Sequence, residues 1–461
     1  MKYIFGIIIV CSLSIGCSKD AADTTVISDP VGTGNDSTSI PVEDTISDTE
    51  LLDFTQKETF KYFWDYAETN SGAARERYVP SNPTLDSHTV TTGGSGFGLM
   101  VLIVGIERGY ITREEGFKRI QKILNFFKNA DRFHGAWPHW IDGTTGKVKP
   151  FSEKDNGGDL VETSFFAQGL LTIKSYFKNG DEDEITLANQ AQKLFDEIEW
   201  SWFTQGQNIL YWHWSPGYGF DINLAIKGFN ECLITYVLAA SSTTYPIDKE
   251  VYTQGWASNG NIVSANTSYN IPLLVKHQGA ETTSGPLFWS HYSFLGLNPN
   301  RLISAYTNYK EVVTNHTNIN YAYCVDNPLG YKDYGENCWG LTASYSRAND
   351  GSLTYSAHQP SNDSGVISPT AALSSMPYTP EKSLRALHYF YKLKDKLVGS
   401  AGFYDAFSPQ YNYWVAQAYL AIDQGPIVIM MENYRTQLLW NLFMQDSNVQ
   451  NGLTKLQFSY E

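Results

Sequence analysis

The chain has 461 residues, which is enough for one large domain or two of ordinary size. It carries 33 Lys and Arg residues against 48 Asp and Glu residues, a formal net charge of −15 at pH 7. This acidic balance argues against nucleic acid as a partner, because a phosphate backbone is bound by clustered basic side chains.

Residues 1–16 have the pattern of a bacterial lipoprotein signal. Lys2 supplies positive charge, an apolar run follows, and Ser14-Ile15-Gly16 precedes Cys17. We expect export, lipidation of Cys17 and anchoring in the bacterial outer membrane, on its periplasmic or cell-surface side. An ordinary cleaved signal is the alternative. The apolar run is too short to span a bilayer, so the lipid is the only membrane contact that we expect.

Residues 17–46 are rich in Ser, Thr, Asp and Gly, a composition that predicts a disordered acidic tether. No second linker divides residues 47–461, which we therefore expect to form one domain and a monomer. Apolar periodicity there predicts a series of helices, alternately buried and amphipathic. They are expected at Leu51–Glu68, Phe97–Gly109, Arg113–Lys128, Asp159–Phe177, Ile185–Trp202, Asn230–Ala240, Asp248–Trp256, Leu287–Leu295, Asn300–Val313, Pro369–Met376, Glu381–Lys392 and Tyr411–Ile422, with an extra one from Ile427 to about Met444.

This alternation indicates an all-α fold, an (α/α)6 toroid built from six helical hairpins. Long aromatic-rich linkers would then gather at one end, where the inner helices begin, and loops of that length are usually functional. Strands are expected only as short arms, at 210–214 and at Tyr321–Val325.

Three carboxylates cluster before one of the predicted buried helices. Asp155, Asp159 and Glu162 are separated by four and three residues across a Gly-Gly pair. Asp159 is suited to cap the helix, which would bring all three acids to its N-terminus and keep them ionised. Such groups can act as a general base or hold sugar hydroxyls. The same spacing also fits a capping box with no chemical role.

Further acids lie in other linkers. Glu231 follows Phe229-Asn230 and precedes an apolar helix, where burial would raise its pKa and the helix N-terminus would lower it, so the direction stays open. Asp405 lies among aromatic residues. Asp423 is expected at the end of an apolar helix, where the dipole disfavours a carboxylate, which makes it a functional candidate. Glu432 is placed to pair with Arg435.

Aromatic residues make up 14% of the chain and concentrate in the same linkers. Their flat faces suit the C–H faces of pyranose rings, although packing of loops is the alternative for any one of them. Cys232, Cys324 and Cys338 remain after the signal, and Cys324–Cys338 is the plausible disulfide of an exported protein. No Cys or His spacing is typical of a metal site, so we expect no metal and no cofactor.

Several stretches together resemble the bacterial glucoamylase-like (glycoamylase) domain, in particular glycoside hydrolase family 144. They are Trp137-Pro138-His139-Trp140, Asp155 to Glu162, Gly228-Phe229-Asn230-Glu231, Gly402 to Phe407, and Ile422 to Pro426 with Glu432-Asn433. The resemblance implies an (α/α)6 toroid and an inverting hydrolase of β-1,2-glucan. It implies essential acids at Asp155, Asp159, Glu162, Glu231 and Asp423. The substrate-binding residues that we expect are Trp137, His139, Trp140, Trp212, Trp214, Trp289, Tyr404, Asp405 and Trp414.

The resulting hypothesis is inverting hydrolysis by two carboxyl groups, with Glu231 as the acid and Asp423 as the base. Asp159 and Glu162 would hold the sugar. The alternatives are an α-glucan-cleaving glucoamylase-like hydrolase and a non-catalytic glycan-binding lipoprotein. A polysaccharide lyase is disfavoured because the linkers are poor in Arg, and endo and exo action are not distinguished.

Overall fold

The computed structural model of the protein describes residues 46–460. The predicted signal, Cys17 and the predicted tether up to residue 45 lie outside the described residues. Residues Ile46–Glu461 make one compact unit. Its α-helices are α1 Asp48–Trp64, α2 Thr92–Glu107, α3 Arg113–Asn129, α4 Leu160–Phe177, α5 Glu182–Asp196, α6 Leu233–Ser241, α7 Tyr309–Asp326, α8 Pro369–Leu373, α9 Pro380–Lys392, α10 Lys394–Leu397, α11 Ala421–Thr436, α12 Leu438–Met444 and α13 Ser447–Lys455.

Short helices and strands fill the connections between these helices. The short helices are η1 Trp200–Thr204, η2 Val251–Trp256, η3 Ser258–Gly260, η4 Leu287–Ser290, η5 Tyr292–Leu295, η6 Pro299–Arg301 and η7 Pro409–Tyr411. The strands are β1 Arg77–Tyr78, β2 Thr89–Thr91, β3 Trp140–Asp142, β4 Val148–Lys149, β5 Gly158–Asp159, β6 His213–Trp214, β7 Thr267–Ser268, β8 Ile271–Pro272, β9 Ala343–Arg347, β10 Leu353–Ala357, β11 Val398–Gly399, β12 Gly402–Phe403, β13 Ala406–Ser408, β14 Trp414–Ala416 and β15 Tyr419–Leu420.

The strands form small antiparallel sheets at the ends of helices. The pairs are β1–β15, β5–β6, β7–β8, β9–β10, β11–β12 and β13–β14, and β2, β3 and β4 make a three-stranded sheet. The described chain is therefore predominantly helical, as the sequence predicted, but it is not free of strands. The predicted strand at 210–214 exists as β6, which pairs with β5 and forms no arm of its own.

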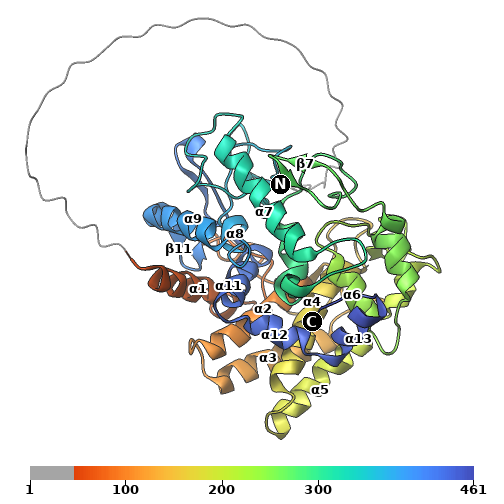
Figure 1. Cartoon of the computed structure of the whole chain (residues 1–461). Coiled ribbons are helices and arrows are strands. Elements are labelled where there is room, and N and C mark those ends of the chain that lie inside the picture. The colour runs from red at the N-terminus through yellow and green to blue at the C-terminus, as the bar shows by residue number, and fades with distance from the viewer. Residues whose placement is uncertain (1–45, 461) are drawn as a thin grey trace, which may run out of the picture. The chain divides into compact units, whose positions relative to one another are not determined.

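The helices fall into buried and amphipathic kinds because of their composition. The helices α2, α4, α6 and α11 bury nearly every residue, whereas α3, α5 and α9 bury one face only. Helix α2 packs against α4 and α11, and α4 packs against α5 and α6. Figure 1 shows α2, α4 and α11 in the interior, with α1, α3 and α5 outside them.

Glycines let the central helices approach closely. A Cβ added at Gly96 of α2 would lie 2.3 Å from the carbonyl oxygen of Phe165 in α4. A Cβ at Gly169 would lie 2.5 Å from the carbonyl oxygen of Gly96. The backbones of α2 and α4 are therefore in contact, and the N-terminus of α2 lies beside the acids that begin α4.

Two predicted helices are wrong. Residues 300–308 are not helical beyond η6; α7 begins after Asn308, whose side-chain oxygen accepts a hydrogen bond from the Lys310 N–H. That helix continues through 321–325, where the sequence predicted a strand. Tyr411–Ile422 contains β14 and β15 in place of the predicted helix, and α11 begins only at Ala421. Asn412 and Tyr413 have φ values of 54°, which a right-handed helix does not accept.

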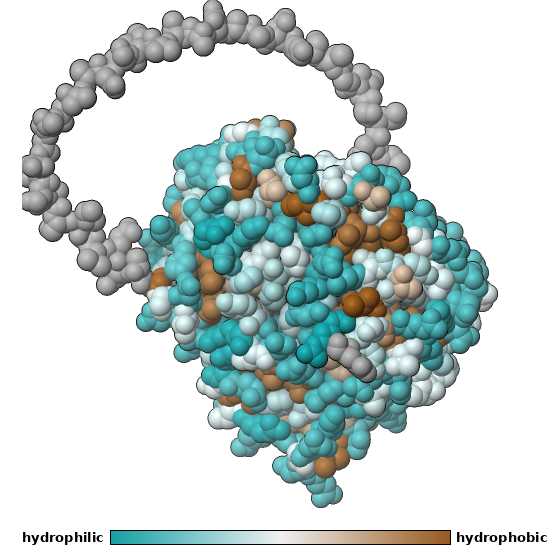
Figure 2. Space-filling view, viewed as in Figure 1, coloured by the Kyte–Doolittle hydropathy of each residue, from teal (hydrophilic) through white to brown (hydrophobic). Residues whose placement is uncertain are grey.

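The described surface is mainly polar, with small separate apolar patches on the face drawn in Figure 2. Among the described residues, no helix is long and apolar enough to cross a membrane. The predicted Cys324–Cys338 disulfide is absent, since both thiols are free. Cys324 lies on α7 and not in a loop, and both cysteines are buried within one apolar cluster. Free Cys behaves there as a small apolar residue.

Candidate active site

Asp159 begins α4 and is fully buried. Its Oδ1 accepts hydrogen bonds from the N–H groups of Val161 (3.0 Å) and Glu162 (2.9 Å). The predicted N-cap is therefore confirmed. The reciprocal half of a capping box is missing, because the Glu162 carboxylate turns to another helix.

The second oxygen of Asp159 belongs to a network with two histidines. Its Oδ2 lies 3.0 Å from His139 Nδ1 and 3.5 Å from His213 Nε2, which is also 3.4 Å from Asp155 Oδ2. Burial raises the pKa of Asp159, but hydrogen bonds from the two histidines outweigh it and leave the pKa below its usual range. Burial lowers the pKa of His139, but Glu162, Asp159 and Asp155 together raise it to about 10. At neutral pH, Asp159 and His139 form an ion pair.

Glu162 projects from the first turn of α4 toward α2. Its Oε2 accepts a hydrogen bond from the Gly93 N–H at 2.8 Å, and Thr91 Oγ1 lies 3.5 Å away. Burial raises the pKa of Glu162 to about 7, and burial and Asp159 also raise that of Asp155. The expectation that the helix N-terminus keeps all three carboxylates ionised is therefore wrong for Glu162, because desolvation outweighs the helix N-terminus and leaves its pKa near neutral pH.

Glu231 lies two residues before α6, in a turn where the Asn230 side chain accepts from the Cys232 N–H at 3.0 Å. The helix begins at Leu233, so Asn230 is not its N-cap. Glu231 is 8% exposed, and its Oε2 has no hydrogen-bond partner in the described part of the chain. Burial raises its pKa to about 7, with Glu162 and Asp159 adding to the shift. This settles the direction that the sequence left open.

Asp405 and Asp423 form a second, separate carboxyl pair. Asp423 lies in the first turn of α11 and not at the end of a helix, which corrects the sequence interpretation. Asp405 Oδ2 accepts from the Tyr345 N–H at 2.7 Å. Burial raises the pKa of Asp405 to about 6, and burial with the neighbouring Asp405 raises that of Asp423 far above its usual range. The pair therefore shares one proton at neutral pH, held by Asp423.

The predicted aromatic residues divide into packing and accessible groups. Trp137 is fully buried, its ring packs on Phe127 and Phe166, and its Nε1 donates to the Phe127 carbonyl. It belongs to the core and cannot stack on a sugar. Trp289 is also buried. Partly exposed rings remain at Trp140, Trp212, Trp214, Tyr404 and Trp414.

The two residues of β6, His213 and Trp214, point to opposite faces because side chains alternate along a strand. His213 pairs with Asp159 and shares its face, whereas Trp214 contacts His134 with ring centroids 4.8 Å apart. His213 was not among the predicted site residues, although it lies between Trp212 and Trp214, which were. Gly93 and Tyr345 were also not predicted, because they contact the acids through backbone N–H groups, which every residue except proline has.

Within the described residues, one set of side chains has the geometry of metal ligands: His139, Asp155 and Asp159, whose ligand atoms lie within 4.8 Å of one another. A pKa of about 10 leaves His139 protonated at neutral pH, and a protonated imidazole has no free lone pair for a metal. The set is better explained as an ion-pair network.

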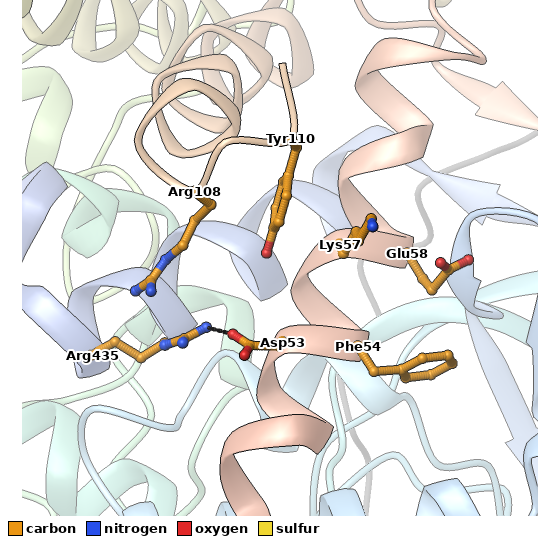
Figure 3. Close-up of a pocket in the computed structure, with 7 residues that line it drawn as sticks. All are labelled: Asp53, Phe54, Lys57, Glu58, Arg108, Tyr110 and Arg435. Atoms are coloured by element: carbon orange, nitrogen blue, oxygen red, sulfur yellow. Dashed lines mark ion pairs between the residues drawn. The ribbon is translucent and has the colours of Figure 1, made fainter. Parts of the chain in front are cut away.

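A pocket of about 450 Å³ lies at the other end of α2 and α11 (Figure 3). Arg108 there forms a two-point ion pair with Glu432, with distances of 2.7 and 2.9 Å, and Arg435 pairs with Asp53 at 2.6 Å. The predicted Glu432–Arg435 pair is therefore wrong, because Glu432 turns toward α2. Arg108 caps the C-terminal end of α2 and Arg435 lies in the last turn of α11, where cations are stabilising, so we assign them a structural role.

Together, a mainly helical protein and a cluster of buried carboxyl groups at helix N-termini define an acid–base site of the kind found in hydrolases. Comparisons with known proteins agree. Residues 223–447 match the family model "Glycoamylase: Putative glucoamylase". The solved structure of an endo-beta-1,2-glucanase from Chitinophaga pinensis is 55% identical, with a TM-score of 0.87 over 90% of this chain and 99% of that one.

Two further relatives come from Parabacteroides distasonis. The structure of its beta-1,2-glucanase is 43% identical, with a TM-score of 0.83, and covers 90% of this chain and 60% of that one. Its exo beta-1,2-glucooligosaccharide sophorohydrolase (non-reducing end) is 44% identical over 435 residues. The chain spans 58% of the length of this curated relative. The chain belongs to the glycoamylase family, which confirms the resemblance seen in its sequence.

Proposed function

We propose that this protein is a glycoside hydrolase that cleaves β-1,2-linked glucan or its oligosaccharides by inversion. The observation that carries the proposal is Glu231, a buried carboxyl group with a pKa of about 7 and an unpartnered Oε2, close enough to Asp159 and Glu162 for their charges to raise its pKa. The substrate class is supported by the β-1,2-glucan activities named for the relatives.

Glu231 is the proposed general acid. A raised pKa keeps it protonated near neutral pH, so it can give a proton to the glycosidic oxygen as the C1–O bond breaks. Asp159 is fixed by α4 and His139 and stays ionised, which suits a group that accepts hydrogen bonds from sugar hydroxyls. Glu162 and Asp155 complete this side of the sugar.

The proposed base is Asp423 acting with Asp405. Water attacks C1 from the face opposite to the leaving oxygen and gives its proton to Asp423, directly or through a sugar hydroxyl. Because Asp423 already holds the shared proton, it passes that proton to Asp405 in the same step. The pair thus accepts one proton in total. Asp405 Oδ1 and both oxygens of Asp423 accept no hydrogen bond from an N–H or O–H donor in the described residues, so beyond the proton that the two carboxyl groups share they remain available to a water or a sugar hydroxyl.

The test is product analysis with residues 46–461 on linear β-1,2-glucan, with soluble starch in parallel. Sophorose or short β-1,2-oligosaccharides from the first substrate alone support the proposal, and their lengths distinguish endo from exo action. Glucose from starch would support the α-glucan alternative, which the family description favours. If neither substrate is cleaved but β-1,2-glucan still binds, and Glu231→Gln leaves this binding unchanged, the chain is a glycan-binding lipoprotein.

We also propose that the fold is an (α/α)6 toroid, supported by the alternation of buried and amphipathic helices. A crystal structure with a different helix arrangement would overturn it. Export, a lipid on Cys17, outer-membrane anchoring and a monomeric state are proposals that rest on the sequence. Palmitate labelling of the full chain, lost in Cys17→Ala, tests the anchor, and light scattering of the soluble unit tests the monomer.

A further inference from the structure

Strands β9 and β10 form a two-stranded antiparallel arm beside the Asp405–Asp423 pair. Their register places Tyr345 of β9 directly opposite Tyr355 of β10. Strand β9 is mostly buried, whereas every residue of β10 is exposed or partly exposed. Directly opposed residues in antiparallel strands project from the same face, so the two tyrosines share one side of the arm.

The backbone of β9 beside this side contacts the acid pair. Tyr345 is 5% exposed, its N–H donates to Asp405 Oδ2 at 2.7 Å, and its hydroxyl accepts from Arg77 at 3.2 Å. Strand β9 also packs against β13, which begins directly after Asp405, and against β14, which pairs with β13. The arm is therefore fixed to the carboxyl pair through its inner strand.

Tyr355 lies next to Tyr345 on the same side of the arm and is also accessible to solvent. Its ring centroid lies 6.4 Å from that of Tyr345, at an interplanar angle of 83°, yet 40% of the residue is exposed. In the described part of the chain no group hydrogen-bonds to its hydroxyl. Desolvation of its hydroxyl, then the charges of Asp423 and Asp405, raise the pKa of Tyr355 well above its usual value, so the hydroxyl keeps its proton and remains a donor.

Tyr292 is a second tyrosine whose pKa is raised by the charge of Asp423. It lies on η5, is 5% exposed, and its ring packs against Phe97 and Phe165 of the central helices. Besides burial, the charges of Asp423, Glu231 and Glu162 raise its pKa. Tyr292 on η5 and Tyr355 on β10 are thus both influenced by the charge of Asp423. Tyr292 is 5% exposed, whereas Tyr355 is 40% exposed and accessible to a ligand.

We propose that Tyr355 is a substrate-binding residue of the glucan site, with its ring against a pyranose face and its hydroxyl donating to a sugar oxygen beside Asp423. An accessible aromatic face with a polar tip has the properties that this contact requires. This inference rests on the proposed function and adds to it: the outer strand of the arm contributes to sugar binding on the side of the proposed base.

The test compares Tyr355→Phe and Tyr355→Ala with Tyr434→Phe. Tyr434 has a similar exposure of 38% but lies near the end of α11, away from the acids. We expect Tyr355→Phe to raise KM for β-1,2-glucooligosaccharides about 3- to 10-fold, the range for one lost hydrogen bond. Tyr355→Ala should raise it more, with a smaller change in kcat, and Tyr434→Phe should match the wild type.

Binding without turnover gives a second readout. In a Glu231→Gln background, calorimetry with a β-1,2-glucooligosaccharide should show the same loss of affinity on Tyr355→Phe. KM and affinity within twofold of the wild type for both Tyr355 variants would overturn the inference, as would a change in melting temperature alone. A wild-type protein that neither cleaves nor binds β-1,2-glucan would instead overturn the proposed function, so the two failures are distinguishable. Because Tyr355→Phe removes only the hydroxyl and keeps the ring, an effect of this variant is not explained by misfolding.

Discussion

Asp159 binds two parts of the molecule with its two carboxylate oxygens: Oδ1 caps α4, and Oδ2 lies 3.0 Å from His139 Nδ1. One side chain therefore caps a buried helix and, with Glu162 and Asp155, raises the pKa of the neighbouring imidazole. The sequence offered capping and catalysis as alternatives for Asp159. The structure shows the cap and the ion pair in the same residue.

Asp159→Asn separates these two roles. Asparagine caps helices nearly as well as aspartate, so the melting temperature should change little. The charge-assisted contact to His139 is lost, and a loss of about 10- to 100-fold in kcat/KM is expected for one such hydrogen bond. NMR titration should show the His139 pKa falling from about 10. An unchanged pKa would show that Asp159 does not control the imidazole charge.

Glu231→Gln should reduce kcat by about 10²- to 10⁴-fold on natural substrate, the usual contribution of a general acid. Substrates with a good leaving group need little protonation and should lose much less. The control is Glu197→Gln, which changes an exposed carboxylate that forms an ion pair with Arg132, and it should leave kcat unchanged. An equal loss on both kinds of substrate would assign Glu231 a role other than the acid.

The pH profile of kcat/KM should be bell-shaped. Glu231 loses its proton as the pH rises through about 7, which removes the acid, and the Asp405–Asp423 pair becomes uncharged as the pH falls through about 6, which removes the base. Glu231→Gln, assayed with a good leaving group, should lose the alkaline limb and keep the acidic one. Loss of the acidic limb instead would exchange the two roles.

The sequence predicted the strongly periodic parts well. The helix at 113–129 and the end of α4 at Phe177 agree within one residue, because apolar spacing and caps are local signals. The predicted helix at Tyr411–Ile422 was wrong, because aromatic spacing over so short a segment suits either a helix or a strand and does not reveal the positive φ values at Asn412 and Tyr413.

The acids were selected from sequence as candidates, and their environments could not be predicted from it. Asp423 was selected because it was expected at a helix C-terminus; it is in fact in a first turn, where its pKa is raised by burial beside Asp405. That partner lies 18 positions away in the chain and on a different element. The direction of each pKa shift depends on such contacts, which composition and spacing do not specify.

Gly93→Ala tests the contact between α2 and α4. An added Cβ would lie 2.6 Å from Glu162 Oε2 and 2.9 Å from Phe165 Cδ2, so the carboxylate must move away from the Gly93 N–H. We expect about 1–3 kcal/mol of destabilisation and a clear loss of activity. Gly335→Ala is the matched control, since nothing lies within 4 Å of its added Cβ. Equal melting temperatures for both variants would contradict close packing at Gly93.

Stability should depend on pH through Glu231 in a predictable direction. Its folded pKa of about 7 lies above the ordinary value of 4.5, so folding favours the protonated form. The resulting stability is present below pH 4.5 and is lost as the pH rises through 7. Because Gln cannot ionise, Glu231→Gln should be more stable than the wild type at pH 8 by up to about 3 kcal/mol, relative to pH 4. Urea denaturation at both pH values measures this difference. A gain of the same size at pH 4 and pH 8 would mean that the Glu231 carboxyl is not desolvated in the folded protein.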